Sequence, residues 1–167
     1  MFTIRSDTYI RSVEKVRKSL TIIGRRDFVD LPGLQLMEID AKIDTGAYTS
    51  ALHVKAIEAF EQDGEQWVRF KLDHPHHPAF NNRKFKMPVF AHKHIKSSSG
   101  QAELRYIVRT QIVLFGKRYM AEFSLTDRSS MDFPVLLGRK LLYRKFLVDV
   151  TQKNLSFKLK HKRKSKE

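Results

Sequence analysis

An alternating run that ends in a carboxylate is the feature that most constrains this chain. Residues 37–43 alternate apolar and polar side chains, with Met37 and Ile43 at the two apolar ends. This is the period of a strand with one buried face. The alternation stops at Asp44-Thr45-Gly46, and another strand-like run follows at once. Because Gly46 permits close backbone approach and Thr45 can bond to neighbouring backbone, the pattern predicts a carboxylate in a tight loop between two strands.

A second stretch far downstream changes how this loop is interpreted. An Asp-Thr-Gly sequence alone is most often an ordinary turn. Here an apolar run, Phe133 to Leu137, ends at Gly138 and leads directly into a short helix-like segment. Asp-Thr-Gly-Ala at residues 44–47, combined with Leu-Leu-Gly-Arg at residues 136–139, resembles the retropepsins, which are single-domain aspartic proteases of retroviral type.

The resemblance extends over about residues 20–150 and is closest to one bacterial branch of that group. The resemblance is carried by the sequence of residues 42–53 and by Ser97-Ser98-Ser99-Gly100, Glu103 and Arg105-Tyr106. Members of this branch are often labelled ATP-dependent zinc proteases or RimK-associated retropepsin-like proteins. The resemblance implies an all-β fold, a closed retropepsin-like β-barrel with one short C-terminal helix.

The site residues also follow from the resemblance. It implies a catalytic group in which Asp44 is the acid, Thr45 braces the loop and Gly46 lines the cleft. It implies substrate-binding or supporting roles for five further residues: Ala47, Tyr48, His53, Gly138 and Arg139. In retroviral enzymes an acidic residue follows the first motif and pairs with the arginine after the second glycine. Tyr48 stands at that position here, so the partner of Arg139 is left open.

Aspartic protease chemistry needs two carboxylates that share one proton, because like charges about 3 Å apart cannot both ionise. The pair activates a water for attack on the peptide carbonyl and then protonates the leaving nitrogen. This chain contains a single Asp-Thr-Gly. A second Asp44 from an identical subunit supplies the missing acid, so we expect a homodimer.

The rest of the chain reads mainly as strands within one domain, residues 20–157. Asp63-Gly64 between two strand-like runs predicts a hairpin. Residues 84–125 contain the segment expected to cover the cleft, although the pattern does not say which hairpin is this flap. Leu155 to Phe157 reads as a closing strand. Nearly all elements are extended, with one helical turn or two after Gly138.

Composition limits the setting in which such a domain works. The 167 residues include no cysteine, which excludes a disulfide framework and a thiolate metal site. We identify no membrane span and no signal-peptide core. We therefore expect a soluble, cytoplasmic protein.

The net charge of +14 is concentrated partly at the ends of the chain. A basic N-terminal arm, residues 1–19, precedes the domain. A basic C-terminal tail, residues 158–167, holds six Lys or Arg against one Glu. Such a field attracts nucleic acid, ribosomal surfaces or acidic peptides without distinguishing among them. Tails that serve only solubility have the same composition.

No cofactor is predicted, and zinc is suggested by the family label alone. The chain has neither His-Glu-x-x-His nor a Gly-rich phosphate loop. Two sets of histidines remain as metal-ligand candidates, although solvated surface histidines are the commoner outcome: His74, His76 and His77 in a Pro-interrupted loop, and His92 and His94 on one strand face.

Two functions are consistent with these observations. The first is a homodimeric aspartic endopeptidase acting on a protein or peptide substrate. The resemblance links it to RimK-type glutamate ligases, which add glutamates to a ribosomal protein, and a basic protease would suit an acidic tail. The alternative is a non-catalytic retropepsin-fold module that binds RNA, the ribosome or an acidic protein.

Overall fold

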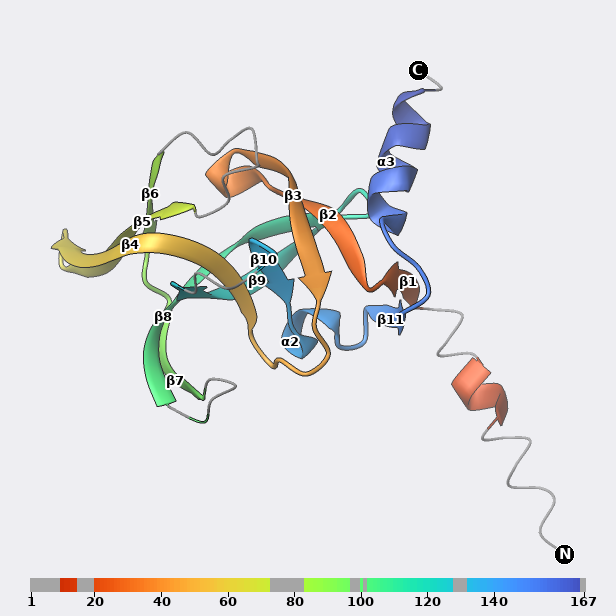
Figure 1. Cartoon of the computed structure of the whole chain (residues 1–167), viewed down its shortest axis with the longest axis horizontal. Helices are drawn as coiled ribbons and strands as arrows, with labels where there is room; N and C mark the ends of the chain where they lie inside the picture. The colour runs from red at the N-terminus through yellow and green to blue at the C-terminus, as the bar shows by residue number, and fades with distance from the viewer. Residues whose placement is uncertain are drawn as a thin grey trace, which may run out of the picture.

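The structure is a computed structural model that describes residues 10–14, 20–72, 83–96, 100, 102–127 and 132–165. Strands dominate it, and the expected mostly-β fold is confirmed (Figure 1). The strands are β1 (Thr21–Gly24), β2 (Arg26–Leu31), β3 (Leu36–Ile43), β4 (Ser50–Gln62), β5 (Glu65–Leu72), β6 (Lys84–Pro88), β7 (Ala91–Lys96), β8 (Ala102–Leu114), β9 (Lys117–Thr126), β10 (Val135–Leu137) and β11 (Phe146–Asp149). The labelled helices are η1 (Pro32–Leu34), α2 (Arg139–Leu142) and α3 (Leu155–Lys164). No described helix has the length and apolar character needed to cross a bilayer.

The strand pairings in the described residues follow a ring. β10 pairs with β3 in parallel and with β4 in antiparallel orientation. From β3 the pairing continues through β2, β8 and β9, and β9 returns to β4 in parallel. The short strand β10, which precedes Gly138, is thus held between the strands on either side of the Asp44 loop. The more specific expectation of a closed barrel stays a prediction.

The central strand β3 follows its alternation with one exception. Ile39, Ala41 and Ile43 are buried, as the period predicts. Met37 is 53% exposed, whereas Leu36 is fully buried. Glu38 has a left-handed backbone (φ 56°), and the β2–β3 register shifts between Val29 and Leu31. A bulge of this kind moves the preceding residues to the opposite face of a strand.

The long strand β4 connects the ring to a hairpin. Its first residues pair with β9 and β10. From Val54 onward it pairs with β5, with an irregularity in the register near Ala56, whose φ is 52°. The predicted hairpin at Asp63 and Gly64 is confirmed: both residues have positive φ, as a tight two-residue turn requires. Residues 73–82, with His74, His76 and His77, lie outside the described residues.

The prediction of a closing strand at Leu155–Phe157 is wrong, because these residues begin α3. Asn154, before the helix, has a left-handed backbone and provides no side-chain cap. Buried Asp27 on β2 accepts hydrogen bonds from the backbone N–H groups of Ser156 (2.8 Å) and Phe157 (3.0 Å). A carboxylate at a helix N-terminus satisfies donors that otherwise lack partners, so a residue 129 positions away selects the helix.

Candidate active site

The Asp44 loop has the compact geometry that its sequence predicts. One carboxylate oxygen of Asp44, Oδ1, accepts hydrogen bonds from the backbone N–H groups of Gly46 (2.9 Å) and Ala47 (3.1 Å). A side chain at residue 46 would place its Cβ 3.2 Å from that oxygen. The carboxylate is therefore oriented by its own loop. It is half-buried, and its neighbours Thr45 and Gly46 are exposed.

Backbone hydrogen bonds lock this loop to the second motif. The Asp44 N–H donates to Leu137 O on β10 (3.0 Å). In return, the N–H groups of Arg139 and Lys140, at the start of α2, donate to the carbonyls of Ala47 and Tyr48, each at 2.9 Å. The first turn of a helix has unpaired N–H groups, and here loop carbonyls satisfy them. The two motifs thus form one folded unit.

Arg139 holds the same loop through its side chain. Its Nη1 donates to the carbonyl oxygens of Thr45 (2.8 Å) and Gly46 (2.9 Å). These two bonds answer the question raised by Tyr48: Arg139 binds loop carbonyls instead of a carboxylate at residue 48. Tyr48 is 59% exposed.

Gly138 is required by close packing. A Cβ at this position would lie 2.8 Å from Tyr48 O and from the carbonyl carbon of Thr49. Real Cβ atoms do not approach backbone so closely, so any side chain would push the loop away. The Gly138 N–H also donates to the hydroxyl of buried Ser50 (3.0 Å).

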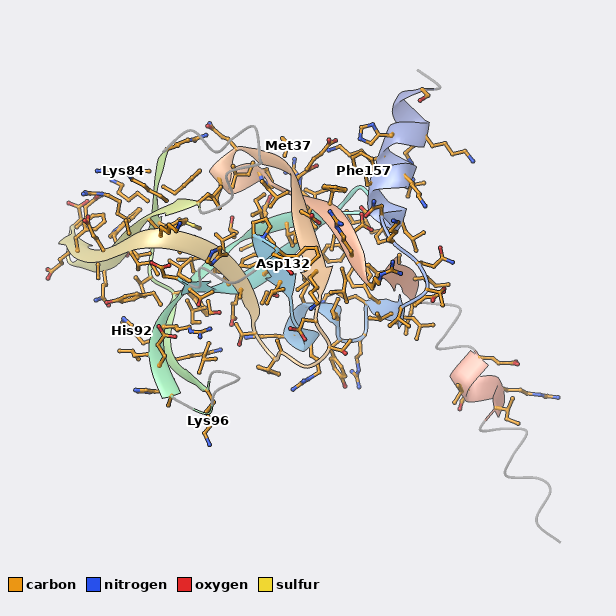
Figure 2. The ribbon with its side chains drawn as sticks, in the orientation of Figure 1. Met37, Lys84, His92, Lys96, Asp132 and Phe157 are labelled. Carbon is orange, nitrogen blue, oxygen red and sulfur yellow. The ribbon has the colours of Figure 1, made fainter. Side chains whose placement is uncertain are left out.

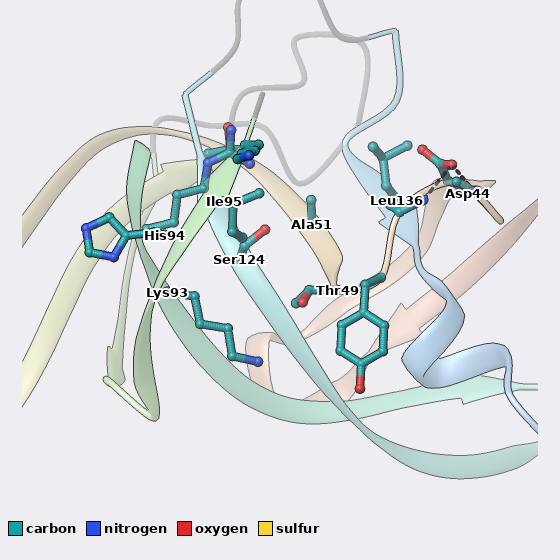
Figure 3. A pocket seen from close by; sticks show the side chains of 14 residues that line it. Asp44, Thr49, Ala51, Lys93, His94, Ile95, Ser124 and Leu136 are labelled. Atoms are coloured by element: carbon teal, nitrogen blue, oxygen red, sulfur yellow. Dashed lines mark hydrogen bonds between the residues drawn. The ribbon is translucent and has the colours of Figure 1, made fainter. Parts of the chain in front are cut away.

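A cavity of about 680 Å³ opens beside the Asp44 loop. One side is formed by loop residues with Leu136, and the opposite side by the β7–β8 hairpin (Figure 3). Lys93, His94, Ile95 and Lys96 come from β7, and Arg105 from β8. Lys96 lies at the free end of this hairpin (Figure 2). Among the described hairpins, β7–β8 is therefore the one placed to act as a flap.

The cavity is unequally charged. Asp44 is the one carboxylate among the described residues that line it, whereas three side chains there carry positive charge: Lys93, Lys96 and Arg105. Arg105 is 6% exposed, and Glu103 Oε2 lies 3.0 Å from its Nε and its Nη2. Glu103 is 57% exposed at its side chain, so Arg105 is the buried member of this pair and the one that lines the cavity.

An ion-pair bridge connects the flap hairpin to α2. Glu122 on β9 accepts hydrogen bonds from Lys140 Nζ at 2.7 Å and lies 3.5 Å from Lys93 Nζ. The hydrogen bond from Lys140, together with the charge of Lys93, holds the pKa of Glu122 below its usual value. This carboxylate therefore ties the two sides of the cavity together at neutral pH.

The structure brings most of the predicted site residues together. Asp44, Gly46, Ala47 and Tyr48 line the cavity, and Gly138 and Arg139 support the loop from behind. Thr45 contributes a carbonyl, not its hydroxyl, to the contact with Arg139.

His53 is not brought to the cavity. It is 3% exposed, and its Nδ1 lies 3.2 Å from Thr126 O inside the fold.

Sequence reasoning placed the segment that covers the cleft within residues 84–125 but gave no individual role to Lys93, Lys96 or Arg105. Arg105 is one of the residues that carry the family resemblance, and this was the sequence signal that could have identified it as a cavity residue.

The described residues do not form a site suited to zinc. No group of three or more His, Asp or Glu side chains that could hold a metal is found among them. His92 and His94 lie on the same face of β7, and His92 packs against the ring of Tyr106 at 5.1 Å. Asp44 belongs to no candidate metal-binding group among the described residues. We therefore derive no chemical step through a metal.

Comparisons with known proteins agree with this geometry. Residues 22–158 match the RimB-like family, described as retropepsin-like aspartic endopeptidase RimB. Two similar proteins, each named probable alpha-L-glutamate ligase, come from Shewanella pealeana (38% identical over 135 residues) and Parasynechococcus marenigrum (36% over 132). The matches cover 78% and 77% of this chain, but 29% and 28% of those relatives, so the chain spans less than a third of their length.

A solved structure has the same fold. Lpg0085 from Legionella pneumophila, a protein described as of unknown function, is 25% identical with a TM-score of 0.68. The match covers 81% of this chain and 98% of that one. Since the family match covers most of the chain and contains both interlocked motifs, this protein belongs to the RimB-like family of retropepsin-like aspartic endopeptidases.

Proposed function

We propose that this protein is an aspartic endopeptidase that works as a homodimer, with Asp44 from each subunit forming the catalytic pair. The observation that carries the proposal is the Asp44 loop, which is locked to Gly138 and Arg139 and opens onto the cavity. A loop held from both sides keeps its carboxylate in one position, as catalysis requires.

The need for a second subunit follows from the charges in the cavity. Asp44 is the one carboxylate among the described cavity residues, whereas the reaction needs two. The exposed residues beside it, Thr45, Gly46 and Tyr48, leave the loop accessible to a second copy. In the dimer the two Asp44 side chains share one proton, activate a water and then protonate the leaving nitrogen. We also propose that each subunit of this dimer is the closed barrel expected from the sequence.

We further propose that the substrate is an acidic peptide. Lys93, Lys96 and Arg105 on the β7–β8 hairpin line the cavity. Lys93 and Arg105 are paired with Glu122 and Glu103, so Lys96 is the cation there to which a glutamate or aspartate side chain would bind most directly. The relatives named probable alpha-L-glutamate ligase support this choice, because attaching glutamate would add carboxylates to a product. A RimK-type ligase or its ribosomal protein product is therefore the proposed functional partner.

Cleavage of a peptide with a glutamate-rich tail tests the proposal. Asp44→Asn is expected to abolish cleavage while preserving the fold, because an amide matches the carboxylate in size but cannot share the proton. The control is Asp63→Asn, which changes a carboxylate in the remote β4–β5 turn and is expected to keep full activity. Activity that survives Asp44→Asn would overturn the assignment. Binding of RNA or an acidic protein without any cleavage by the native protein would favour the non-catalytic module.

The acidic substrate has a separate test. Lys96→Gln is expected to reduce kcat/KM for the glutamate-rich peptide by about two- to fivefold, the usual value of one exposed charge contact. A glutamine-rich peptide should show no such change. Lys84→Gln, an exposed lysine on β6, serves as the matched control. Equal effects on both peptides would contradict the acidic preference and leave the catalytic assignment intact.

A further inference from the structure

The C-terminal helix α3 lies away from the flap and is anchored firmly to the domain. In Figure 1 it stands at one end of the molecule, while the β7–β8 hairpin lies at the other. Phe157 packs its ring 5.0 Å from that of Phe28 on β2, and it points toward the strands in Figure 2. The hydroxyl of Ser156 accepts a hydrogen bond from the Phe115 N–H (2.7 Å). With the Asp27 cap, these contacts fix the helix in one orientation.

The inner face of α3 uses two of its basic residues. Lys160 Nζ lies 2.9 Å from Asp30 and 3.2 Å from Glu38. His161 Nε2 lies 3.0 Å from the same carboxylate of Glu38. Among the described residues, these are the ion pairs that α3 makes. These contacts pair Asp30 and Glu38 with cations, while Asp27 accepts hydrogen bonds from the backbone N–H groups at the start of the helix.

Three further basic residues of α3 face solvent. Lys158 and Lys162 are exposed and lie one turn apart, and Arg163 is exposed on the flank. No described acid pairs with them, and α3 itself contains neither Asp nor Glu. Like charges at this spacing repel each other and weaken a helix by a few tenths of a kcal/mol. The positive charges on the solvent face of α3 therefore do not stabilise the domain itself.

A neighbouring turn extends the same positive surface. Arg163 Nη1 lies 3.1 Å from the position that a Cβ on Gly116 would occupy, so α3 touches the β8–β9 turn. The next two residues, Lys117 and Arg118, are exposed. Arg118 is paired across the ladder with Val113, which lines the hollow beside α3, and paired residues share a face of the sheet.

We infer that Lys158, Lys162, Arg163 and Arg118 form a binding surface for the phosphate backbone of a nucleic acid. The surface consists of a helix that projects from the end of the molecule (Figure 1) and a neighbouring turn, and its cationic side chains are exposed. Such a surface suits regularly spaced phosphates, which need charge and reach but no individual pockets. Because the helix is already ordered, binding does not need to fold it. This inference is independent of the active site, and Asp44→Asn should leave the binding unchanged.

The test compares the full chain with a triple variant, Lys158→Gln, Lys162→Gln and Arg163→Gln. Glutamine keeps helix propensity, and the variant leaves Lys160 and His161 in place. The control triple, Lys42→Gln, Lys84→Gln and Lys86→Gln, removes the same charge from β3 and β6. Binding is measured over a salt series with three probes of matched charge: a short RNA hairpin, a DNA hairpin of the same sequence, and poly-L-glutamate.

The α3 variant is expected to bind both hairpins about tenfold or more weakly, with the slope of log K against log salt reduced by about two to three. The control should change both quantities less. A stronger loss with RNA than with DNA would identify RNA as the natural source of the phosphates. Equal losses in the two triple variants would overturn the inference, as would poly-L-glutamate binding to α3 in preference to either hairpin.

A second measurement does not depend on how the variant folds. Acetylation of lysines in the native protein, with and without the RNA hairpin, reports which side chains become covered. Protection of Lys158 and Lys162, with Lys84 unprotected, supports the surface. Protection of Lys93 and Lys96 instead would place the nucleic acid at the cavity and overturn it.

Discussion

At the scale of single residues, the candidate site depends on contacts that orient one carboxylate. Asp44 receives two backbone hydrogen bonds, and its loop receives two more from one nitrogen of Arg139. Each of these contacts is a single hydrogen bond that one substitution can remove. Arg139 and Gly138 therefore allow the loop's position to be changed without touching the acid itself.

Arg139→Gln is expected to lower kcat by about ten- to a hundredfold, with KM nearly unchanged, because a slightly displaced acid reacts slowly but the cavity persists. Since Arg139 is exposed, the free energy of unfolding should fall by less than about 1 kcal/mol. Arg139→Lys should restore part of the rate, since an ammonium group also donates hydrogen bonds to carbonyls but lies on a shorter side chain than the Nη1 that bonds both of them. Steady-state kinetics and chemical unfolding measure both effects. Equal losses of rate in the Gln and Lys variants would contradict the positioning role.

Gly138→Ala is expected to destabilise the protein by about 1–3 kcal/mol, because the added methyl group overlaps the backbone of Tyr48 and Thr49. Cleavage should fall with it, since the Asp44 loop must move. Gly64→Ala is the control: its methyl group enters open space, so its cost of about 1 kcal/mol comes from backbone strain alone. That variant should keep full activity. Equal losses of stability and activity in Gly138→Ala and Gly64→Ala would contradict the role of close packing at Gly138.

At the scale of elements, α3 is attached to β2 and β3 by groups that titrate. Burial alone would raise the pKa of Glu38, but hydrogen bonds from Lys160 and His161 outweigh this and lower it. Burial alone would lower the pKa of Lys160, yet its bonds to Asp30 and Glu38 raise it. The attachment is thus strongest where both groups are charged.

Lys160→Met is expected to reduce the free energy of unfolding by about 1–2 kcal/mol near neutral pH, because Asp30 loses its cation and keeps the hydrogen bond from the Glu38 N–H. A lowered carboxylate pKa stabilises the fold above its ordinary value of 4.5 and loses that effect as pH falls. A raised lysine pKa stabilises below 10.5 and loses that effect as pH rises. The difference between native and variant should therefore shrink at both extremes. Lys162→Met, which changes an exposed lysine on the same helix, should show no such dependence.

At the scale of the whole molecule, one chain carries half of the proposed catalytic machinery. Activity should therefore require association, and specific activity should fall on dilution below the dissociation constant of the dimer. An equal mixture of native and Asp44→Asn subunits, allowed to exchange, should retain about a quarter of the native activity, since random pairing leaves that share of intact dimers. A value near one half would mean that each subunit acts alone. Sedimentation over the same concentrations provides the control.

Metal removal is a second test on the whole protein. Thorough chelation is expected to leave the cleavage rate unchanged, because a pair of aspartic acids activates water without a metal. The reference is untreated protein passed through the same exchange steps. Loss of activity that zinc alone restores would overturn the aspartic mechanism and direct attention to His74, His76, His92 and His94.

The sequence by itself determined the local structure around Asp44. The alternation of β3, the glycines and the Asp63-Gly64 turn are short-range signals, and each depends on backbone preferences that act within a few residues. A single Asp-Thr-Gly also indicated the need for a second subunit before any geometry was known. Gly138 was recognised from its motif, although the reason for it, contact with Tyr48 and Thr49, lies about ninety residues away along the chain.

Only the tertiary structure decided which distant residues meet. Lys93 and Arg105 reach the cavity because β7 and β8 fold over it, and no local pattern specifies that pairing. Met37 left its predicted face because of a bulge at Glu38, and Leu155–Phe157 became helical because Asp27 caps them from β2. Short apolar runs fit either a strand or a helix by period alone, so a contact from elsewhere in the chain makes the choice.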